Sequence, residues 1–495
     1  MKNKIPTILL LFRLAAQLLA AQPPQALAQF LDSPFMQGAS CAFLAKEIHT
    51  GEILYAHEAD RIMPPASVLK LLTTATALEV LGPKHRFATT LEYDGALTDR
   101  VLRGNLYIRG SGDPTLGSAH IAPDRRRYTP DQNNFISPWV EALKAQGVRE
   151  ISGSVIADER IFDNEGVSMK WPWEDLGSYY GAGCYGLSVF DNTYELHLRS
   201  GRVGEQPEIL FCLPEIPSLG FHNHLRSARI PTDSSYLVGA PLARERYLYG
   251  AVPANEHDLV LRGDIPDPPL FLAQYVDRRL QEEGIAVGGQ PTSFRLLGLL
   301  PKEPQASQKE RKILATTYSP PLSEVVRITN QRSHNLYAEA LLRTLGLKYK
   351  TKSNEVISSA EKGIRTIHAH WEKKGLDTSG LWMYDGCGLA PADKLTASFI
   401  CNLLIYMATK SEHSDVFLSS LPRAGMEGTV SGILKATALQ GKALLKSGSM
   451  SRVRTYAGFI TKGNKQYAVA LFTCNYPCTM QEITKEIEKL LLALF

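Results

Sequence analysis

The stretch Pro64-Pro65-Ala66-Ser67-Val68-Leu69-Lys70 leads directly into a mostly apolar run over residues 71–81. No proline interrupts that run and Gly82-Pro83 follows it, so the sequence predicts a buried helix there. Proline can precede a helix but disrupts its interior, so Ser67 is predicted to lie in the first turn. Lys70 then follows three residues later, on the same face as Ser67.

The Ser67–Lys70 spacing can bring an amine to a hydroxyl. A serine hydroxyl is a weak nucleophile at neutral pH and needs a base beside it. A lysine can be that base only where desolvation or another cation destabilises its ammonium. Ser-x-x-Lys also arises often by chance on solvated helices, although a lysine within an apolar helix must be exposed or paired. The interpretation therefore depends on partners elsewhere in the chain.

Length and composition describe a multidomain globular protein. The chain has 495 residues, which favours two or three domains. Hydrophobic residues make up 44% and charged residues 21%, which is typical of a folded protein. The net charge of +4 is small for this length and gives no reason to expect nucleic acid as a partner.

The N-terminus has the pattern of a targeting segment. Lys2 and Lys4 precede a mostly apolar run from residue 5 to residue 21, with small residues at its end. This pattern predicts a signal peptide over 1–21, cleaved between 21 and 28, and export to the periplasm or cell envelope. The alternative is a membrane anchor, for which the run is short and interrupted, so no stable span is expected after signal removal.

Cysteine and histidine usage predicts no metal site. The seven cysteines are odd in number, so at least one is unpaired within the chain, and their pairing stays open. His222-Asn223-His224 and His368-Ala369-His370 have no further ligands nearby, and we interpret them as surface histidines.

Two later motifs complete a set with Ser67-x-x-Lys70. Ser333-His334-Asn335 precedes a strong helical pattern, and Lys446-Ser447-Gly448 ends a predicted strand. Each motif is weak alone, but the three in this order are the motif set of penicillin-binding proteins. The chain resembles the class C low-molecular-mass penicillin-binding proteins, which are D-alanyl-D-alanine carboxypeptidases/endopeptidases. The resemblance runs from about Gly38 to the C-terminus.

Further stretches carry the same resemblance. They are Gly110-Ser111-Gly112-Asp113-Pro114-Thr115-Leu116, Gly153-Ser154-Val155-Ile156-Ala157-Asp158, Trp171-Pro172-Trp173, Asp385-Gly386-Cys387-Gly388-Leu389 and Gly425-Met426-Glu427-Gly428-Thr429.

The resemblance implies an α+β, multidomain fold. Its core is a penicillin-binding/β-lactamase-like serine transpeptidase fold, an antiparallel sheet flanked by helices, with inserted mainly-β domains. The long interval between Lys70 and Ser333 fits insertions between the first two motifs. The expected ranges are 29–95 and 305–495 for the DD-peptidase (penicillin-binding) domain, 96–170 and 250–304 for inserted domain II, and 171–249 for inserted domain III.

The resemblance also implies a role for each motif residue. Ser67 would attack the carbonyl between two D-alanines, Lys70 would take its proton, and Ser333 would relay a proton to the leaving amine. Asn335 would hold the substrate amide and Lys70. Lys446 would bind the terminal carboxylate and help keep Lys70 neutral.

The end of the third motif is expected to bind substrate, through Ser447, Gly448 and Ser449. The hydroxyls of Ser447 and Ser449 would contact the terminal carboxylate, and the backbone N–H groups of Ser67 and Ser449 would form the oxyanion hole. Such two-step acyl transfer is expected to use no metal and no cofactor.

The chain departs from the family pattern in three places. His334 stands where the family often has Asp, and serine replaces threonine in Lys446-Ser447-Gly448. In the loop after Asp385 the family has Ser, Ser and Arg where this chain has Cys387, Ala390 and Pro391. The loss of that arginine leaves the preference for the stem-peptide side chain open.

Three functions remain as hypotheses. The first is a serine-type D-Ala-D-Ala carboxypeptidase, with endopeptidase activity as a further option, whose partners are peptidoglycan stem peptides and β-lactam antibiotics. The second is a catalytically weak cell-wall-binding protein of the same fold, suggested by His334 and the altered loop. The third is a β-lactamase, against which the long insertion argues.

Overall fold

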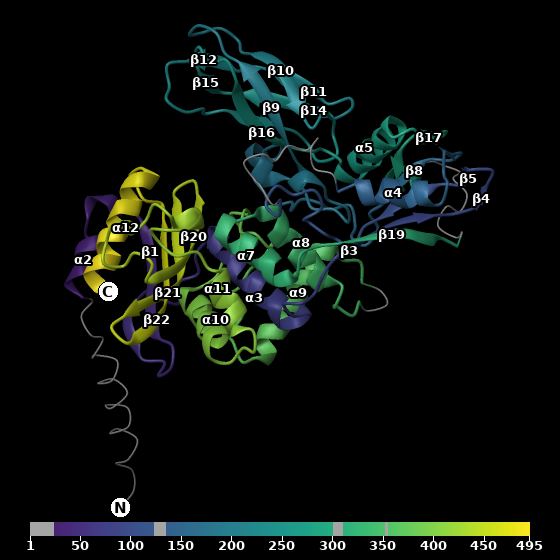
Figure 1. Ribbon diagram of the computed structural model, residues 1–495. Coiled ribbons are helices and arrows are strands. Elements are labelled where there is room, and N and C mark those ends of the chain that lie inside the picture. The colour runs from purple at the N-terminus through teal and green to yellow at the C-terminus, as the bar shows by residue number, and fades with distance from the viewer. Residues whose placement is uncertain (1–23, 123–134, 300–309, 352–354) are drawn as a thin grey trace, which may run out of the picture.

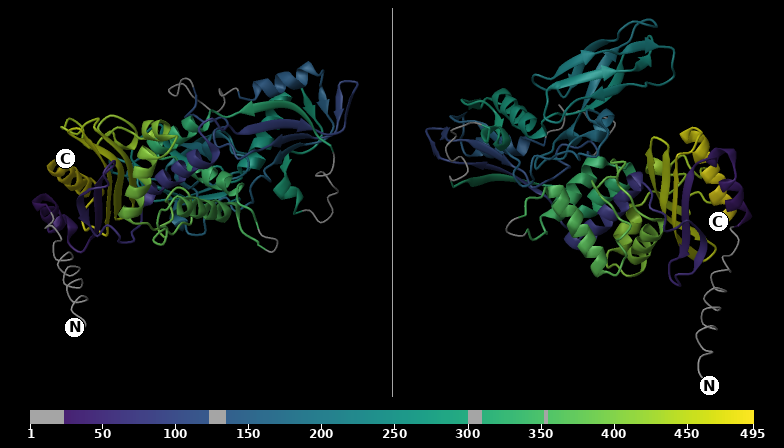
Figure 2. Two further views of the ribbon diagram at one scale, coloured as in Figure 1. Left: turned by 90° about the horizontal axis from the view of Figure 1, so that it is seen from below. Right: turned by 180° about the vertical axis from the view of Figure 1, so that it is seen from behind.

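The computed structural model describes residues 24–122, 135–299, 310–351 and 355–495. The predicted signal peptide, 1–21, lies outside the described residues. A sheet and a helical layer occupy one side of the molecule, and smaller sheets from the middle of the chain extend away from them (Figures 1 and 2).

The main sheet joins the two ends of the described chain. Its five antiparallel strands lie in the order β2-β1-β22-β21-β20. Their bounds are β1 Ser40–Glu47, β2 Ile53–His57, β20 Ala443–Met450, β21 Val453–Lys462 and β22 Lys465–Cys474. Strand β1 near the start of the described chain is therefore hydrogen-bonded to β22 near its end.

Both faces of this sheet are buried, because alternate residues of each strand point to opposite sides. On β22, Ala468, Ala470 and Phe472 pack into the core shared with the helical layer. Val469 and Leu471 pack on the other face, against α12 (Met480–Leu494) and α2 (Gln25–Leu31). The sheet is thus flanked by helices, in agreement with the expected architecture (Figure 1).

The helical layer surrounds α3 (Leu69–Leu81), whose residues from Leu69 to Leu78 are all buried. This confirms the predicted buried helix. The surrounding helices are α7 Leu322–Arg332, α8 Asn335–Gly346, α9 Ser359–Lys373, α10 Ala397–Thr409 and α11 Ser414–Ser420. Burial of α3 on all sides explains why its sequence is apolar without a polar face.

Two sheets of the inserted region share one hydrophobic core with α4 (Ser137–Ala145) and α5 (Pro268–Glu282). One sheet has the order β18-β8-β6-β3-β19 and the other β17-β7-β5-β4. The bounds are β3 Ala88–Tyr93, β4 Ala96–Thr98, β5 Val101–Arg103, β6 Leu106–Arg109, β7 Glu150–Ile151, β8 Val155–Asp158, β17 Ala286–Val287, β18 Thr292–Ser293, β19 Lys312–Tyr318 and a short α6 Phe294–Leu297.

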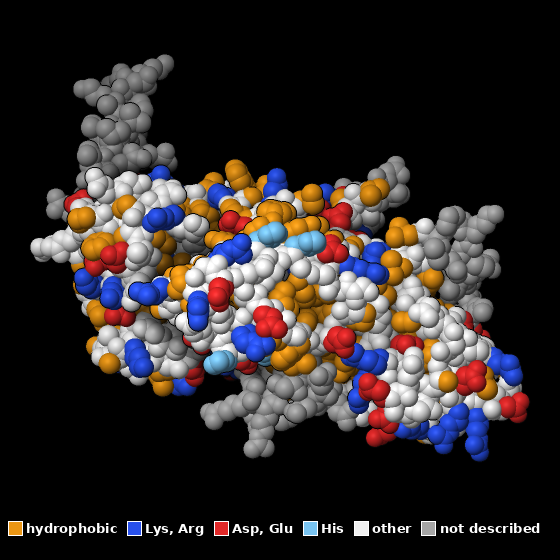
Figure 3. Space-filling view, turned by 90° about the horizontal axis from the view of Figure 1, so that it is seen from above, with side chains coloured by type: hydrophobic (Ala, Val, Ile, Leu, Met, Phe, Trp, Pro, Cys, Tyr) orange, Lys and Arg blue, Asp and Glu red, His pale blue; other side chains and the backbone are white. Residues whose placement is uncertain are grey.

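Three small sheets form the far end of the insertion, in the orders β10-β9-β16, β11-β14-β13 and β12-β15. Their bounds are β9 Thr193–Arg199, β10 Glu208–Leu213, β11 Gly220–Asn223, β12 Arg226–Ala228, β13 Tyr236–Val238, β14 Glu245–Tyr249, β15 Ala251–Pro253 and β16 Leu259–Asp264. Seen from above, basic, acidic and hydrophobic side chains are interspersed on the surface (Figure 3).

The domain ranges drawn from the sequence stay a prediction, and one observation bears on their edges. Strands β3 and β19 lie within the ranges assigned to the peptidase domain, 29–95 and 305–495. They pair with each other and, through β3, with β6 of the inserted region. An alternating strand pattern does not indicate which sheet a strand joins, so sequence alone could not place these two.

Candidate active site

Ser67 lies on a tight turn between the main sheet and the helical layer. The turn is the 3-10 segment η2 (Ala66–Val68), and α3 begins directly after it at Leu69. Ser67 therefore lies in the 3-10 turn just before α3, whereas the sequence predicted it in the first turn of the helix itself. The hydroxyl of Thr455 on β21 donates to the carbonyl of Pro65 at 2.7 Å, which fixes this turn against the sheet. Ser67 is half-buried and faces the site.

Lys70 is fully buried, and its ammonium nitrogen contacts three oxygens. Its Nζ lies 2.9 Å from Ser67 Oγ, 2.7 Å from Asn335 Oδ1 and 2.6 Å from the carbonyl of Cys387. Burial lowers the pKa of Lys70, against the raising influence of nearby acidic groups that include Cys387 and Asp385. A lysine with a lowered pKa next to a serine hydroxyl has the geometry and the chemistry of a general base.

The second motif lies at the junction of two helices. Ser333 ends α7 with a left-handed backbone (φ 56°), and Asn335 begins α8. The side-chain amide of Asn335 accepts from Lys70 and donates through Nδ2 to the carbonyl of Tyr180 at 2.7 Å. Asn335 therefore connects Lys70 to a segment of the insertion, η5 (Tyr179–Gly181).

The third motif lies on strand β20, on the edge of the sheet next to η2. Lys446 is fully buried, and its Nζ donates to Ser333 Oγ at 2.8 Å and to the Ser447 carbonyl at 2.6 Å. Burial holds the pKa of Lys446 well below its usual range, and the charge of Lys70 lowers it further. The two lysines thus share one desolvated site, which favours an anionic ligand.

Gly448 is required by the close approach of β20 to the turn that carries Ser67. A Cβ at Gly448 would lie 2.3 Å from Thr455 Oγ1, 2.8 Å from the Pro65 carbonyl oxygen and 2.9 Å from the Ser67 nitrogen. Ser447 Oγ is 2.9 Å from the hydroxyl of Thr429, and Ser449 is exposed. The strand therefore presents its end to the space in front of Ser67.

The loop after Asp385 holds the Cys387 carbonyl in place. The carboxylate of Asp385 accepts four backbone N–H groups between Cys387 and Ala390, and it accepts the Trp171 Nε1–H at 2.7 Å. Pro391, at the position where the family has arginine, is exposed. The residue types at 387, 390 and 391 differ from the family pattern, but Asp385 is kept, and its carboxylate orders the loop.

Two groups of three side chains in the described part of the chain have metal-ligand chemistry. In the first, Glu339, Asp385 and Cys387 are buried, and its carboxylates bond to Arg343 and to backbone N–H groups. The second consists of His120, Asp191 and His334.

The structure brings all the sequence-predicted residues into one region. Lys70 contacts both Ser67 and Asn335. Lys446 contacts Ser333 in a separate hydrogen bond. Sequence reasoning missed the backbone carbonyls of Tyr180 and Cys387, because a main-chain acceptor leaves no mark in the residue type. The roles of these residues remain a prediction.

The fold and the site define a penicillin-binding type of peptidase. Residues 24–492 match the model of the D-Ala-D-Ala carboxypeptidase 3 (S13) family, and the chain belongs to that family. This confirms the predicted family, the fold class and the D-Ala-D-Ala carboxypeptidase class of enzyme.

Known proteins resemble the chain over most of its length. The D-alanyl-D-alanine carboxypeptidase of Actinomadura sp. (strain R39) is 26% identical over 442 residues, which cover 87% of this chain and 77% of the relative. The crystal structure of penicillin binding protein 4 (dacB) from Haemophilus influenzae has a TM-score of 0.79 at 22% identity and covers 95% of this chain and 98% of that one. A second structure of that protein, complexed with a β-lactam, has a TM-score of 0.74 at 21% identity, and covers 95% of this chain and 99% of that one.

Proposed function

We propose that this protein is an exported serine-type D-Ala-D-Ala carboxypeptidase that acts on peptidoglycan peptides through an acyl-enzyme on Ser67. The observation that carries the proposal is the 2.9 Å contact between Ser67 Oγ and the buried amine of Lys70. The family supports the substrate class, because D-Ala-D-Ala is the terminus of peptidoglycan stem peptides.

In the first step, Ser67 Oγ attacks the carbonyl carbon between the two D-alanines as Lys70 accepts the hydroxyl proton. The C–N bond then breaks, and the terminal D-alanine leaves with the proton that Lys70 accepted, relayed through Ser333, whose Oγ is 2.8 Å from Lys446 Nζ. In the second step water attacks the ester as Lys70 accepts a proton from it, and that proton returns to Ser67 Oγ as the acyl group leaves as a carboxylic acid. No redox change is involved, and the protons balance.

The electrostatics of the site favour attack only when the substrate is bound. Burial lowers the pKa of both Lys70 and Lys446, so each amine is more easily deprotonated than a solvated lysine. A substrate carboxylate next to Lys446 stabilises the ammonium of Lys446, and that positive charge disfavours protonation of Lys70. Carboxylate binding therefore favours the neutral Lys70 that the attack requires.

The same nucleophile is proposed to react with β-lactams. In a β-lactam the ring carbonyl takes the position of the scissile amide, and the leaving nitrogen stays attached. The complex of the Haemophilus influenzae protein with a β-lactam supports this reaction for the fold. Export to the periplasm or cell envelope is part of the proposal and rests on the signal-peptide pattern of residues 1–21.

The test is intact-protein mass spectrometry after incubation with penicillin, followed by a digest of purified muropeptides. We expect one adduct per chain, mapped to Ser67, and release of D-alanine. Ser67→Ala should remove both the adduct and the product. Ser323→Ala is the matched control, because Ser323 is a half-buried serine in the first turn of α7, outside the site.

The outcome separates the three hypotheses. Product from the Ser67→Ala variant would refute the proposal. Binding of muropeptides without an adduct or product would favour the wall-binding protein, and rapid turnover of nitrocefin would favour a β-lactamase. Cleavage of cross-linked dimers beside D-alanine release would add endopeptidase activity.

A further inference from the structure

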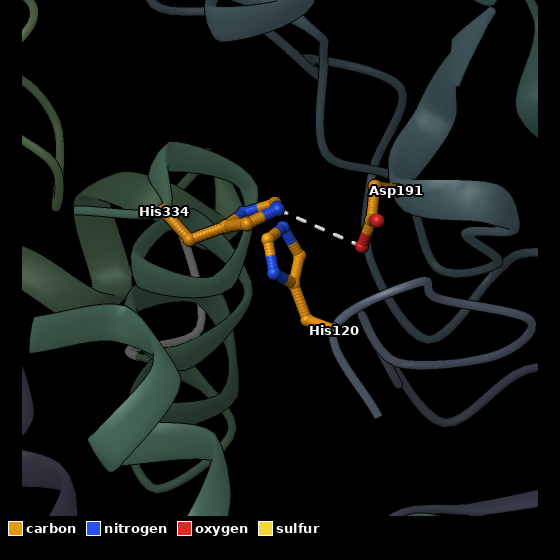
Figure 4. A group of neighbouring side chains, drawn as sticks. All are labelled: His120, Asp191 and His334. Carbon is orange, nitrogen blue, oxygen red and sulfur yellow. Dashed lines mark ion pairs between the residues drawn. The ribbon is translucent and has the colours of Figure 1, made fainter. Parts of the chain in front are cut away.

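Three side chains from distant parts of the sequence meet next to the second motif. His120 follows β6, Asp191 belongs to the turn η6 (Phe190–Asn192), and His334 lies between α7 and α8. One ligand-type atom from each lies within 4.8 Å of the other two. In Figure 4 the three side chains point toward one another from three separate segments.

The spacing of the group fits a metal ion better than a hydrogen bond. Nε2 of His334 is 3.6 Å from Oδ1 of Asp191, which is longer than a hydrogen bond. Two ligands about 2.1 Å from a tetrahedral Zn²⁺ are about 3.4 Å apart. The remaining separations are at most 4.8 Å, and His120 lies in a loop and is only half-buried, so its side chain has room to rotate toward the other two.

The imidazole of His334 is available as a ligand. Its side chain is only 15% exposed, and Nε2 is the ring nitrogen that faces Asp191. The other ring nitrogen, Nδ1, is buried without a hydrogen-bond partner among the described residues. A neutral imidazole binds a metal ion through one of its ring nitrogens.

Polar contacts behind the group hold its members in position. The hydroxyl of Tyr337 donates to Ser118 Oγ at 2.7 Å, and Ser118 Oγ accepts the backbone N–H of His120. Tyr337 also interacts with the Asp191 carboxylate, and its ring lies 4.2 Å from that of His334. Outer contacts of this kind orient the ligands in metal sites.

From this geometry we propose that His120, Asp191 and His334 bind one divalent transition-metal ion of the Zn²⁺ type. Two imidazoles and one carboxylate are a ligand set that Zn²⁺ accepts, with water in the fourth position. The bound ion joins two segments of the inserted region to the residue between Ser333 and Asn335. The sequence gives no sign of this group, because its ligands lack a zinc-type spacing.

The test is isothermal titration calorimetry of the full chain with ZnCl₂, after EDTA treatment and dialysis. We expect one Zn²⁺ per chain and a higher thermal midpoint with bound Zn²⁺. Asp191→Asn and His120→Asn should each weaken binding at least tenfold, since loss of even an outer-shell partner costs about 10–100-fold. Asn tolerates the left-handed backbone of residue 191 (φ 57°), so the first variant preserves the turn.

The matched control is His222→Asn. His222 also faces a carboxylate, Glu245, at 2.9 Å, but it lies outside the group. Zn²⁺ binding that is absent, or that persists unchanged in both group variants, would overturn the proposal, and so would loss of binding in the control. If one of the two variants, Asp191→Asn or His120→Asn, is itself less stable and has a lower thermal midpoint in EDTA, the Zn²⁺ affinity of the other variant decides the test. Calorimetry does not depend on peptidase activity, so failure here is distinct from failure of the proposed function.

Discussion

Substitution of Gly448 by alanine tests whether the spacing between β20 and the Ser67 turn controls the proposed reaction. Gly448 lies next to the turn, and its missing side chain leaves room for three atoms of Thr455, Pro65 and Ser67. Two of these atoms are main-chain atoms, so rotation of a side chain cannot relieve the contact.

The size of the effect follows from the distances. A new Cβ would be 2.8 Å from the Pro65 oxygen and 2.9 Å from the Ser67 nitrogen, whereas ordinary contacts begin at 3.4 Å. The strand and the turn must therefore separate by roughly half an ångström, which displaces Ser67 from the third motif. Because a misplacement of about 1 Å can cost about 100-fold in rate, we expect acylation to slow by roughly 10- to 100-fold.

The assay is the second-order rate of acylation by a fluorescent penicillin, with circular dichroism as the check on folding. Gly432→Ala is the control, because a Cβ at Gly432 meets nothing within 4 Å. The double variant Gly448→Ala/Thr455→Ala should not recover the rate, since the two main-chain contacts remain. Acylation of a folded Gly448→Ala variant within a factor of two of the parent would refute the reasoning.

Four further predictions concern protonation and stability. Burial lowers the pKa of Lys70, so the acylation rate should fall to half its maximum, on acidification, at a pH below 10.5, the ordinary pKa of lysine. A half-maximal rate at or above pH 10.5 would contradict this. Trp171→Phe removes a hydrogen bond to the buried carboxylate of Asp385 and should lower the free energy of unfolding by about 1.5–3 kcal/mol in a denaturant titration, and an unchanged midpoint would argue against it. Ile487→Ala opens a cavity under α12 and should cost about 2–5 kcal/mol by the same titration, while penicillin acylation of the folded protein stays unchanged. Burial raises the pKa of Asp113 to about 6, above its value of 3.8 in the unfolded chain. The stability that this group contributes is therefore complete below the unfolded value and is lost as pH rises through the folded value. Asp113→Asn should flatten the dependence of the thermal midpoint on pH in that window, and a parallel pH profile for the variant would count against the assignment.

Local features of the sequence were sufficient to predict several elements. The pattern Thr479-x-x-Glu482 predicts a helix start, and the structure has a capping box there at the start of α12. Gly463-Asn464 predicts a turn between two strands, and β21 and β22 pair across it. These signals work because each depends on residues that are close together in the chain.

Other features depend on contacts that a sequence pattern does not encode. Lys70 bonds to the carbonyl of Cys387, and any residue type offers a carbonyl. The sheet membership of β3 and β19 depends on pairing between distant strands. The Trp171–Asp385 hydrogen bond joins two stretches that each resemble the family, but their proximity is a property of the fold.

The inserted region is part of the frame of the active site, because several contacts reach from it to the motif residues. The amide of Asn335 bonds to Lys70 on one side and to the Tyr180 carbonyl on the other, so the orientation of Asn335 depends on both. The buried Arg343 of α8 donates to the carbonyls of Glu165 and Gly166. A buried amide or guanidinium that lost such partners would be left unsatisfied, at a cost of about 1–3 kcal/mol per group. The insertion therefore stabilises the arrangement of Lys70 and Asn335, and the proposed metal ion at His334 would strengthen the same connection.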